Sequence, residues 1–121
     1  MKKLELKHLV YQGYNPLKVV FEDGTIDLIQ SVDYFNGVIG FLNNTSNHLL
    51  SQGTFKLELK PFEEYLNIGE IIGEMTQFEL EVLGKNPDLI GGISYDVVEK
   101  MLKHHIDIWG LINQGLAVKW N

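Results

Sequence analysis

The clearest strand in the chain is marked by strict alternation of apolar and charged residues. Over residues 54–60, Phe55, Leu57 and Leu59 alternate with charged side chains. This is the period of a half-buried strand, and Pro61 ends it because proline cannot continue a sheet ladder. We predict a strand here whose three apolar side chains face the core.

Residues 17–30 predict a β-hairpin. Asp23-Gly24 separates two apolar runs and can supply the positive φ angles of a two-residue turn. With that turn, Phe21 lies opposite Ile26 on the buried face, and the other face is largely wet.

The rest of the first 90 residues gives weaker patterns. Residues 4–14 fit a strand or a helix equally well. Residues 34–41 predict a second, shorter hairpin, and residues 43–53 predict a polar loop. Residues 62–90 are the hardest to interpret. For them we favour a helix or turn near 62–66 and a strand at 77–83.

A two-sided pattern of helical period follows Ser94, which is a good N-cap residue. It predicts one helix of about 20 residues that runs to Gln114, with Gly115 as the residue that ends it. Its apolar stripe consists of Val97, Val98, Met101, Leu102, Ile108, Trp109 and Ile112. Residues 116–120 can then return as a last strand.

Together these elements predict a single α+β domain over residues 1–121. A small, mostly antiparallel sheet would pack against the long C-terminal helix. The length of 121 residues and the hydrophobic content of 45% suit one domain with one core.

The charge of the chain limits the classes of partner that it is expected to bind. The formal net charge is −6, and all ten basic residues are lysines. Proteins that grip nucleic acid need a basic face and commonly use Arg, so direct nucleic-acid binding is disfavoured. An acidic surface suits solubility or a basic protein partner.

Cysteine is absent, so disulfides, zinc–thiolate centres and thiol nucleophiles are excluded. The first residues carry no apolar run of signal-peptide length, and no window approaches a membrane span. We therefore expect a cytoplasmic protein with no membrane association.

His104, His105 and Asp107 form the one cluster that invites a metal or acid–base role. On a continuous helix, His105 lies within the apolar stripe and Asp107 points nearly the opposite way. We therefore expect His105 to pack in or beside the core with one ring hydrogen bond and His104 to be exposed. No catalytic, cofactor or metal residue is assigned, and these three remain weak metal candidates.

Two other groups of residues could form sites. The acidic residues between 63 and 81 do not converge at helix or strand spacing and are expected to form a solvated face. Trp109 continues the apolar stripe and is expected in the core. Trp120 could cover the core or belong to an interface.

Three stretches resemble small proteins encoded by phages and prophages of Bacteroidetes. The block 104–118 reads His-His-Ile-Asp-Ile-Trp-Gly-Leu-Ile and then Gly-Leu-Ala, which is similar to the ending of those proteins. Residues 21–25 and 57–62 are similar to two further segments, although Lys60 stands where Arg is usual. Residues 63–92 depart from the pattern. No activity is assigned to these proteins, so the resemblance implies an origin and no catalytic residues.

The leading hypothesis is a non-enzymatic phage or prophage accessory protein that acts by protein–protein contact in the cytoplasm of a bacterial host. It would need no cofactor, would have a protein partner and could form a homo-oligomer. One alternative is a small metal-dependent enzyme that uses His104, His105 and Asp107. Another alternative is a component of a nucleic-acid-processing complex that does not itself bind the nucleic acid.

Overall fold

The computed structural model describes residues 3–86 and 91–120. Within these residues the protein is α+β, and its strands form one sheet in the order β4-β3-β2-β1-β5-β6. Neighbouring strands are antiparallel except β5 and β6, which are parallel. The strands are β1 (Lys18–Phe21), β2 (Ile26–Asp33), β3 (Val38–Phe41), β4 (His48–Leu49), β5 (Phe55–Leu59) and β6 (Ala117–Lys119).

Six helices have both ends within the described residues, and three of them are 3-10 helices. The 3-10 helices are η1 (Leu6–Gly13), η2 (Leu50–Gln52) and η3 (Phe62–Asn67). The α-helices are α1 (Gly69–Ile72), α2 (Gln77–Lys85) and α3 (Tyr95–Lys103). None of these helices has the length and apolar character needed to cross a bilayer.

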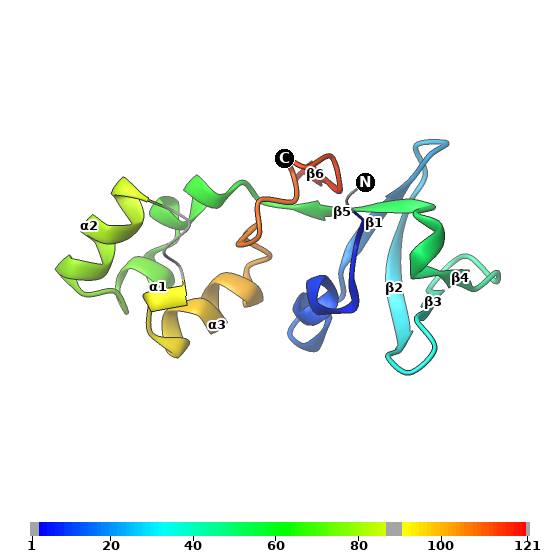
Figure 1. Cartoon of the computed structure of the whole chain (residues 1–121), viewed down its shortest axis with the longest axis horizontal. Helices are drawn as coiled ribbons and strands as arrows, with labels where there is room; N and C mark the ends of the chain where they lie inside the picture. The colour runs from blue at the N-terminus through cyan, green and yellow to red at the C-terminus, as the bar shows by residue number, and fades with distance from the viewer. Residues whose placement is uncertain (1–2, 87–90, 121) are drawn as a thin grey trace.

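The sheet and the α-helices lie at opposite ends of the molecule (Figure 1). We call these ends the sheet lobe and the helical lobe. Each has its own buried apolar cluster, and α3 packs against both α1 and η1. Val98 and Ile108 touch both clusters, so the two cores adjoin along the C-terminal third of the chain.

The alternating strand is confirmed as β5. Phe55 is 4% exposed, while Leu57 and Leu59 are fully buried. The last strand is confirmed as β6, which pairs in parallel with β5. Residues 4–14, which the pattern left open, fold into η1 and place Leu9 and Tyr11 in the core of the sheet lobe.

The first hairpin is present, but its predicted register is wrong by one residue. Phe21 donates its N–H to Thr25 O at 2.9 Å, and Val20 pairs with Ile26. The loop therefore has three residues and ends at Gly24, which has φ +87°. Such a loop is a common alternative to the two-residue turn.

The change of register turns Ile26 outward, where it is 61% exposed, and buries Asp27. The Asp27 carboxylate oxygen Oδ1 accepts two backbone N–H groups, that of Asn43 at 3.1 Å and that of Leu28 at 2.7 Å. Asp27 thus holds the start of the loop that follows β3, which explains a polar residue on the buried face.

The second hairpin is also present, although β2 extends to Asp33, so that Tyr34 and Phe35 belong to the turn. The predicted polar loop at 43–53 carries the short elements β4 and η2. A 3-10 helix at 62–67 agrees with the predicted helix or turn near 62–66.

The predicted strand at 77–83 is wrong, because this segment is helix α2. Thr76 and Glu79 form a capping box, in which the Thr76 side chain accepts the Glu79 N–H and Glu79 accepts the Thr76 N–H. This reciprocal cap satisfies two backbone donors that a new helix leaves free. This cap outweighs the short strand-like alternation of Phe78, Leu80 and Val82 with polar residues. In the helix that forms instead, Phe78 is 71% exposed.

The predicted long C-terminal helix is also wrong, because α3 ends at Lys103. The N–H of His105 bonds to Leu102 O at 3.0 Å, and that of Ile106 bonds to Met101 O at 2.9 Å. This pair of bonds is a Schellman motif, which closes a helix through a residue in the left-handed conformation. That residue is His105, with φ +58°, and not the predicted Gly115.

Candidate functional site

The segment His104–Asp107 joins the two lobes. Once the chain has left α3, its backbone lies beside the end of β5. Lys60 donates its N–H to His105 O at 2.9 Å, and Asp107 donates its N–H to Lys60 O at 2.9 Å. We call residues 104–107 the joint, because they fix helix α3 to the sheet.

Asp107 holds the turn that follows the joint. It is 4% exposed, and its two carboxylate oxygens accept the N–H groups of Leu111 at 2.8 Å and Ile112 at 2.9 Å. The expectation that Asp107 lies on the solvated side of a helix is therefore wrong. Both of its oxygens are used to satisfy backbone donors of the next turn.

His105 is buried in the wall between the lobes and is 3% exposed. Its ring nitrogen Nε2 lies 3.2 Å from Asn15 O, and its other ring nitrogen, Nδ1, has no hydrogen-bond partner among the described residues. Burial lowers the pKa of His105 from its ordinary value. A carbonyl only accepts, so Nε2 carries the proton of the neutral ring.

The burial and the single ring hydrogen bond of His105 agree with the sequence-based expectation. The backbone path that produces them does not, because His105 reaches the core from a left-handed residue after the helix. The φ angle of +58° is uncommon outside glycine, although histidine is among the residues that tolerate it best.

His104 points toward the helical lobe and is partly exposed. Its Nε2 lies 2.9 Å from Glu70 Oε2, and the Nζ atoms of Lys100 and Lys103 lie 3.2 and 3.6 Å from Glu70 Oε1. The hydrogen bonds from His104 and Lys100 lower the pKa of Glu70 to about 2. Glu70 is thus an anion that binds both lysines and His104.

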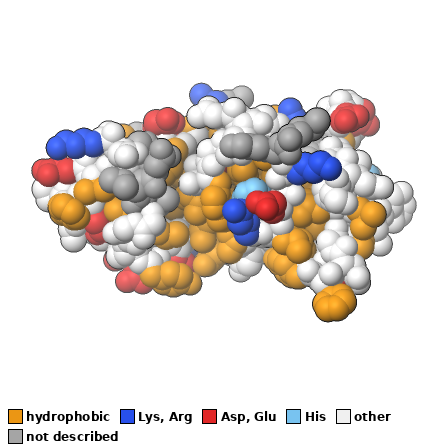
Figure 2. Space-filling view, in the orientation of Figure 1, with side chains coloured by type: hydrophobic (Ala, Val, Ile, Leu, Met, Phe, Trp, Pro, Cys, Tyr) orange, Lys and Arg blue, Asp and Glu red, His pale blue; other side chains and the backbone are white. Residues whose placement is uncertain are grey.

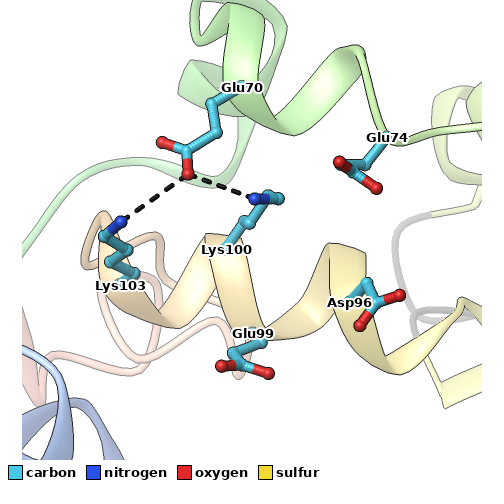
Figure 3. Close-up of a pocket in the computed structure, with 6 residues that line it drawn as sticks. All are labelled: Glu70, Glu74, Asp96, Glu99, Lys100 and Lys103. Atoms are coloured by element: carbon cyan, nitrogen blue, oxygen red, sulfur yellow. Dashed lines mark hydrogen bonds and ion pairs between the residues drawn. The ribbon is translucent and has the colours of Figure 1, made fainter.

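A cavity of about 340 Å³ lies beside this cluster, between α1 and α3 (Figure 3). Its walls carry Glu74, Asp96 and Glu99 in addition to Glu70 and the two lysines. In Figure 3 both lysine side chains turn toward Glu70, and Glu99 points away from it on the far side of α3. We call this hollow the acidic cavity.

The three weak metal candidates do not meet at a common centre. His104 bonds to Glu70, His105 to Asn15, and Asp107 to two backbone amides. Over residues 3–86 and 91–120 there is no group of three His, Cys, Asp or Glu side chains placed to hold a metal ion. Each candidate instead has a partner that explains its position in the fold.

The expected solvated acidic face is wrong for Glu79, whereas Glu70 is exposed. Glu79 is 8% exposed, and its Oε2 accepts the N–H of Ser94 at 3.0 Å, so it links the start of α2 to the start of α3. The spacing of Thr76 and Glu79 signals the capping box of α2, but the sequence carries no signal for the bond to Ser94.

A second cavity, of about 250 Å³, lies on the other side of the joint, where the two lobes meet. The residues described in its walls are Asn15, Pro16, Lys18, Leu28, Lys60, Lys103, His104, His105 and Trp120. We call it the basic cavity. Lys18 Nζ and Lys60 Nζ lie 5.0 and 5.2 Å from the centre of a Trp120 ring.

Sequence reasoning missed Lys18 and Lys60. Trp120 is half-buried. Its backbone N–H donates to Leu59 O at 2.8 Å, which places the residue beside Lys60 across the parallel pair of β5 and β6. Parallel pairing of strands so distant in sequence leaves no local signal. Trp109, expected in the core, is half-buried and packs edge-on against His8 and Tyr11.

The turn between β2 and β3, residues 33–37, presents an apolar side chain to solvent. Phe35 is 96% exposed and its neighbour Tyr34 is 56% exposed. Figure 2 shows a hydrophobic protrusion at the end of the sheet lobe where Figure 1 places this turn.

This turn is held by several hydrogen bonds. Asp33 Oδ1 accepts the N–H groups of Phe35 at 3.0 Å and Asn36 at 3.1 Å, and Asp33 Oδ2 accepts the Asn36 side-chain amide at 2.9 Å. Gly37 donates its N–H to Asp33 O at 2.8 Å and has φ +69°. The backbone that carries Phe35 is therefore well defined.

Comparison of the chain with protein-family models, curated proteins and solved structures gives no match. Functional inference therefore rests on the geometry of the joint, the two cavities and the β2–β3 turn.

Proposed function

We propose that the protein is a non-enzymatic accessory protein that acts by protein–protein contact through the β2–β3 turn. The observation that carries this proposal is the 96% exposure of Phe35 on a turn braced by Asp33. Scattered exposed apolar side chains are normal on a protein surface. A fully exposed phenylalanine at the tip of an ordered turn is less easily explained by chance.

Aromatic side chains that enter a pocket on the partner commonly carry a large share of binding energy. Binding also costs less when the segment is already ordered in its bound conformation. The Asp33 bonds supply that order, and Gly37 supplies the left-handed residue that the turn requires. The partner that fits is a protein with an apolar pocket large enough for one aromatic ring.

The setting is part of the same proposal. The resemblance of residues 104–118 to proteins of Bacteroidetes phages and prophages supports a phage or prophage origin. The absence of cysteine supports a reducing compartment, the cytoplasm of a bacterial host, as the place of action. A second copy of the chain is one form that the partner could take.

The test places a photo-crosslinking phenylalanine analogue at residue 35 and, as the control, at residue 78. Phe78 is also an exposed phenylalanine, 71% accessible, but it lies on α2 in the helical lobe. In host cells we expect a discrete covalent adduct from position 35 that position 78 does not give. An adduct with a second copy would identify a homo-oligomer.

Substitution then measures the contribution of the ring. Phe35→Ser should weaken binding of the identified partner by about 30-fold, or about 2 kcal/mol, which is the lower bound for a binding hot spot. Phe78→Ser should leave the affinity unchanged. Equal adducts from both positions, or equal affinity for both variants, would contradict the proposal.

A further inference from the structure

The basic cavity has the opposite charge to the protein as a whole. The chain carries a formal net charge of −6, yet the described lining of this cavity contains three lysines, two histidines and no carboxylate. The acidic cavity lies on the other side of His104 and Lys103. The joint therefore separates a region of negative charge from one of positive charge.

Two of the lysines have no acidic partner among residues 3–86 and 91–120. None of the salt bridges within the described residues involves Lys18 or Lys60. Both ammonium groups are instead held near Trp120, at 5.0 and 5.2 Å from a ring centre. A cation over an aromatic face is stabilised, but its charge is not neutralised. Two fixed positive charges therefore remain at the cavity wall.

His105 adds an observation that does not depend on the lysines. Its ring lines the cavity, is 3% exposed and is fixed through Asn15, while Nδ1 has no described partner. Because Nε2 donates to Asn15 O and burial lowers the pKa of His105, Nδ1 is the acceptor of a neutral ring and can take a hydrogen bond from a protonated phosphate oxygen.

The backbone conformation of His105 also supports a functional role for this residue. Glycine is the usual residue at the left-handed position of a Schellman motif, and histidine there adopts φ +58°. A conformation of this kind persists where the surroundings enforce it, and such positions gather at functional sites. Here the sequence keeps an imidazole at a position that glycine would occupy without strain.

We propose that the basic cavity binds a phosphate group, either as inorganic phosphate or as the phosphate of a small monoester. Arginine, which binds carboxylates and phosphates bidentately, is absent from this chain, and lysine binds phosphate as a point charge. Two lysine charges match the charge of about −1.5 to −2 on a phosphate monoester at pH 7 better than the single charge of a carboxylate. Lys18 and Lys60 would supply the charge, and His105 would line the site between them and the core. This binding function is independent of the β2–β3 turn.

The experiment is an NMR titration of the full chain with inorganic phosphate at constant ionic strength. The Trp120 indole and the His105 ring report from the walls of the cavity. We expect both signals to shift saturably with one shared dissociation constant. Phosphoserine is titrated in parallel to distinguish a monoester from the free ion, and acetate is titrated as the carboxylate control.

Lys60→Gln and Lys18→Gln should each weaken phosphate binding by about tenfold, the effect of losing one hydrogen bond to a charged group. The backbone bonds of residue 60 to the joint are kept in the first variant. Lys56→Gln is the matched control, because Lys56 lies on β5 four residues before Lys60, is exposed and does not line this cavity. It should change the affinity by less than twofold.

Three results would overturn the proposal. One is the absence of a saturable shift at Trp120 and His105. A second is an equal loss of affinity in Lys56→Gln, which would indicate nonspecific attraction to surface lysines. The third is acetate binding as tightly as phosphate, which would indicate a general anion surface.

Discussion

Strand β5 and the joint meet at Lys60, yet the sequence predicts them with very different success. The alternation along β5 translates directly into structure, since Phe55, Leu57 and Leu59 are all buried. The helical stripe after Ser94 predicts a helix through residues 104–107, and the helix ends before them.

The stripe marks burial only in part. Ile108 and Ile112 pack against the core of the sheet lobe from turns that no helix contains. Ile106, Asp107 and Leu111 lie off the stripe and are more deeply buried. Beyond Lys103 the helical period therefore indicates neither the backbone path nor the full set of buried residues. Over β5 the alternation indicates both, because strand pairing on both sides fixes the backbone.

The largest expected effect tests the β5 side of this comparison. Leu57→Asp places an unpaired charge at a fully buried position between β1 and β6. We expect the free energy of unfolding to fall by more than about 4 kcal/mol, or the protein not to fold. Urea titration followed by circular dichroism measures this.

The adjacent residue provides the control for strand facing. Glu58→Ala should change the free energy of unfolding by less than about 0.5 kcal/mol, as expected for a surface substitution with no special role. Similar losses in the two variants would show that β5 does not have one buried and one open face.

A smaller effect is expected at Asp107, on the joint side. Asp107→Ala removes the acceptors of the Leu111 and Ile112 N–H groups and leaves these donors without a partner. We expect a loss of about 3 kcal/mol, since each bond to a charged group contributes about 1.5 kcal/mol or more. Chemical denaturation measures the loss.

Asp107→Asn separates this role from simple loss of volume. The amide keeps one acceptor oxygen. Asp107→Asn should therefore lower the free energy of unfolding by about half as much as Asp107→Ala does. If the two variants were equally destabilised, the carboxylate oxygens would not be holding the turn.

The failures of sequence-based prediction have a common physical origin. Asp23-Gly24 is compatible with a two-residue or a three-residue loop, and the three-residue loop places Asp27 where it accepts the N–H of the distant Asn43. The strand predicted at 77–83 competed with a local capping box that the alternation concealed. In both places the structure observed is the one in which a side chain accepts a backbone N–H.

The candidate site likewise combines features that the sequence predicts with features that it does not. Burial of His105 follows from its place in the apolar stripe. The approach of Lys18 and Lys60 to Trp120 does not, because it depends on parallel pairing between β5 and β6. The helix end at Lys103 could not be read either, since the left-handed residue there is histidine and not glycine.

The smallest expected effect decides directly whether residue 105 lies in a helix. His105→Ala and His105→Gly both remove the ring, and they differ only in the backbone conformation that they favour. At φ +58° a β-carbon is unfavourable, so the glycine variant should be more stable than the alanine variant by about 1 kcal/mol. In a helix interior the order is reversed, because glycine costs about 1 kcal/mol relative to alanine. Glu99 lies inside α3 and provides that reference.

The comparison therefore needs four variants, alanine and glycine at positions 105 and 99, each measured by urea titration. We expect glycine to be the more stable residue at 105 and alanine the more stable residue at 99. The sign of the difference, and not its size, carries the result, because both members of each pair lose the same native side chain. If alanine were favoured at both positions, residue 105 would be helical, and the continuous C-terminal helix predicted from the apolar stripe would be correct after all. The joint would then lose the backbone turn that now brings His105 into the wall of the basic cavity.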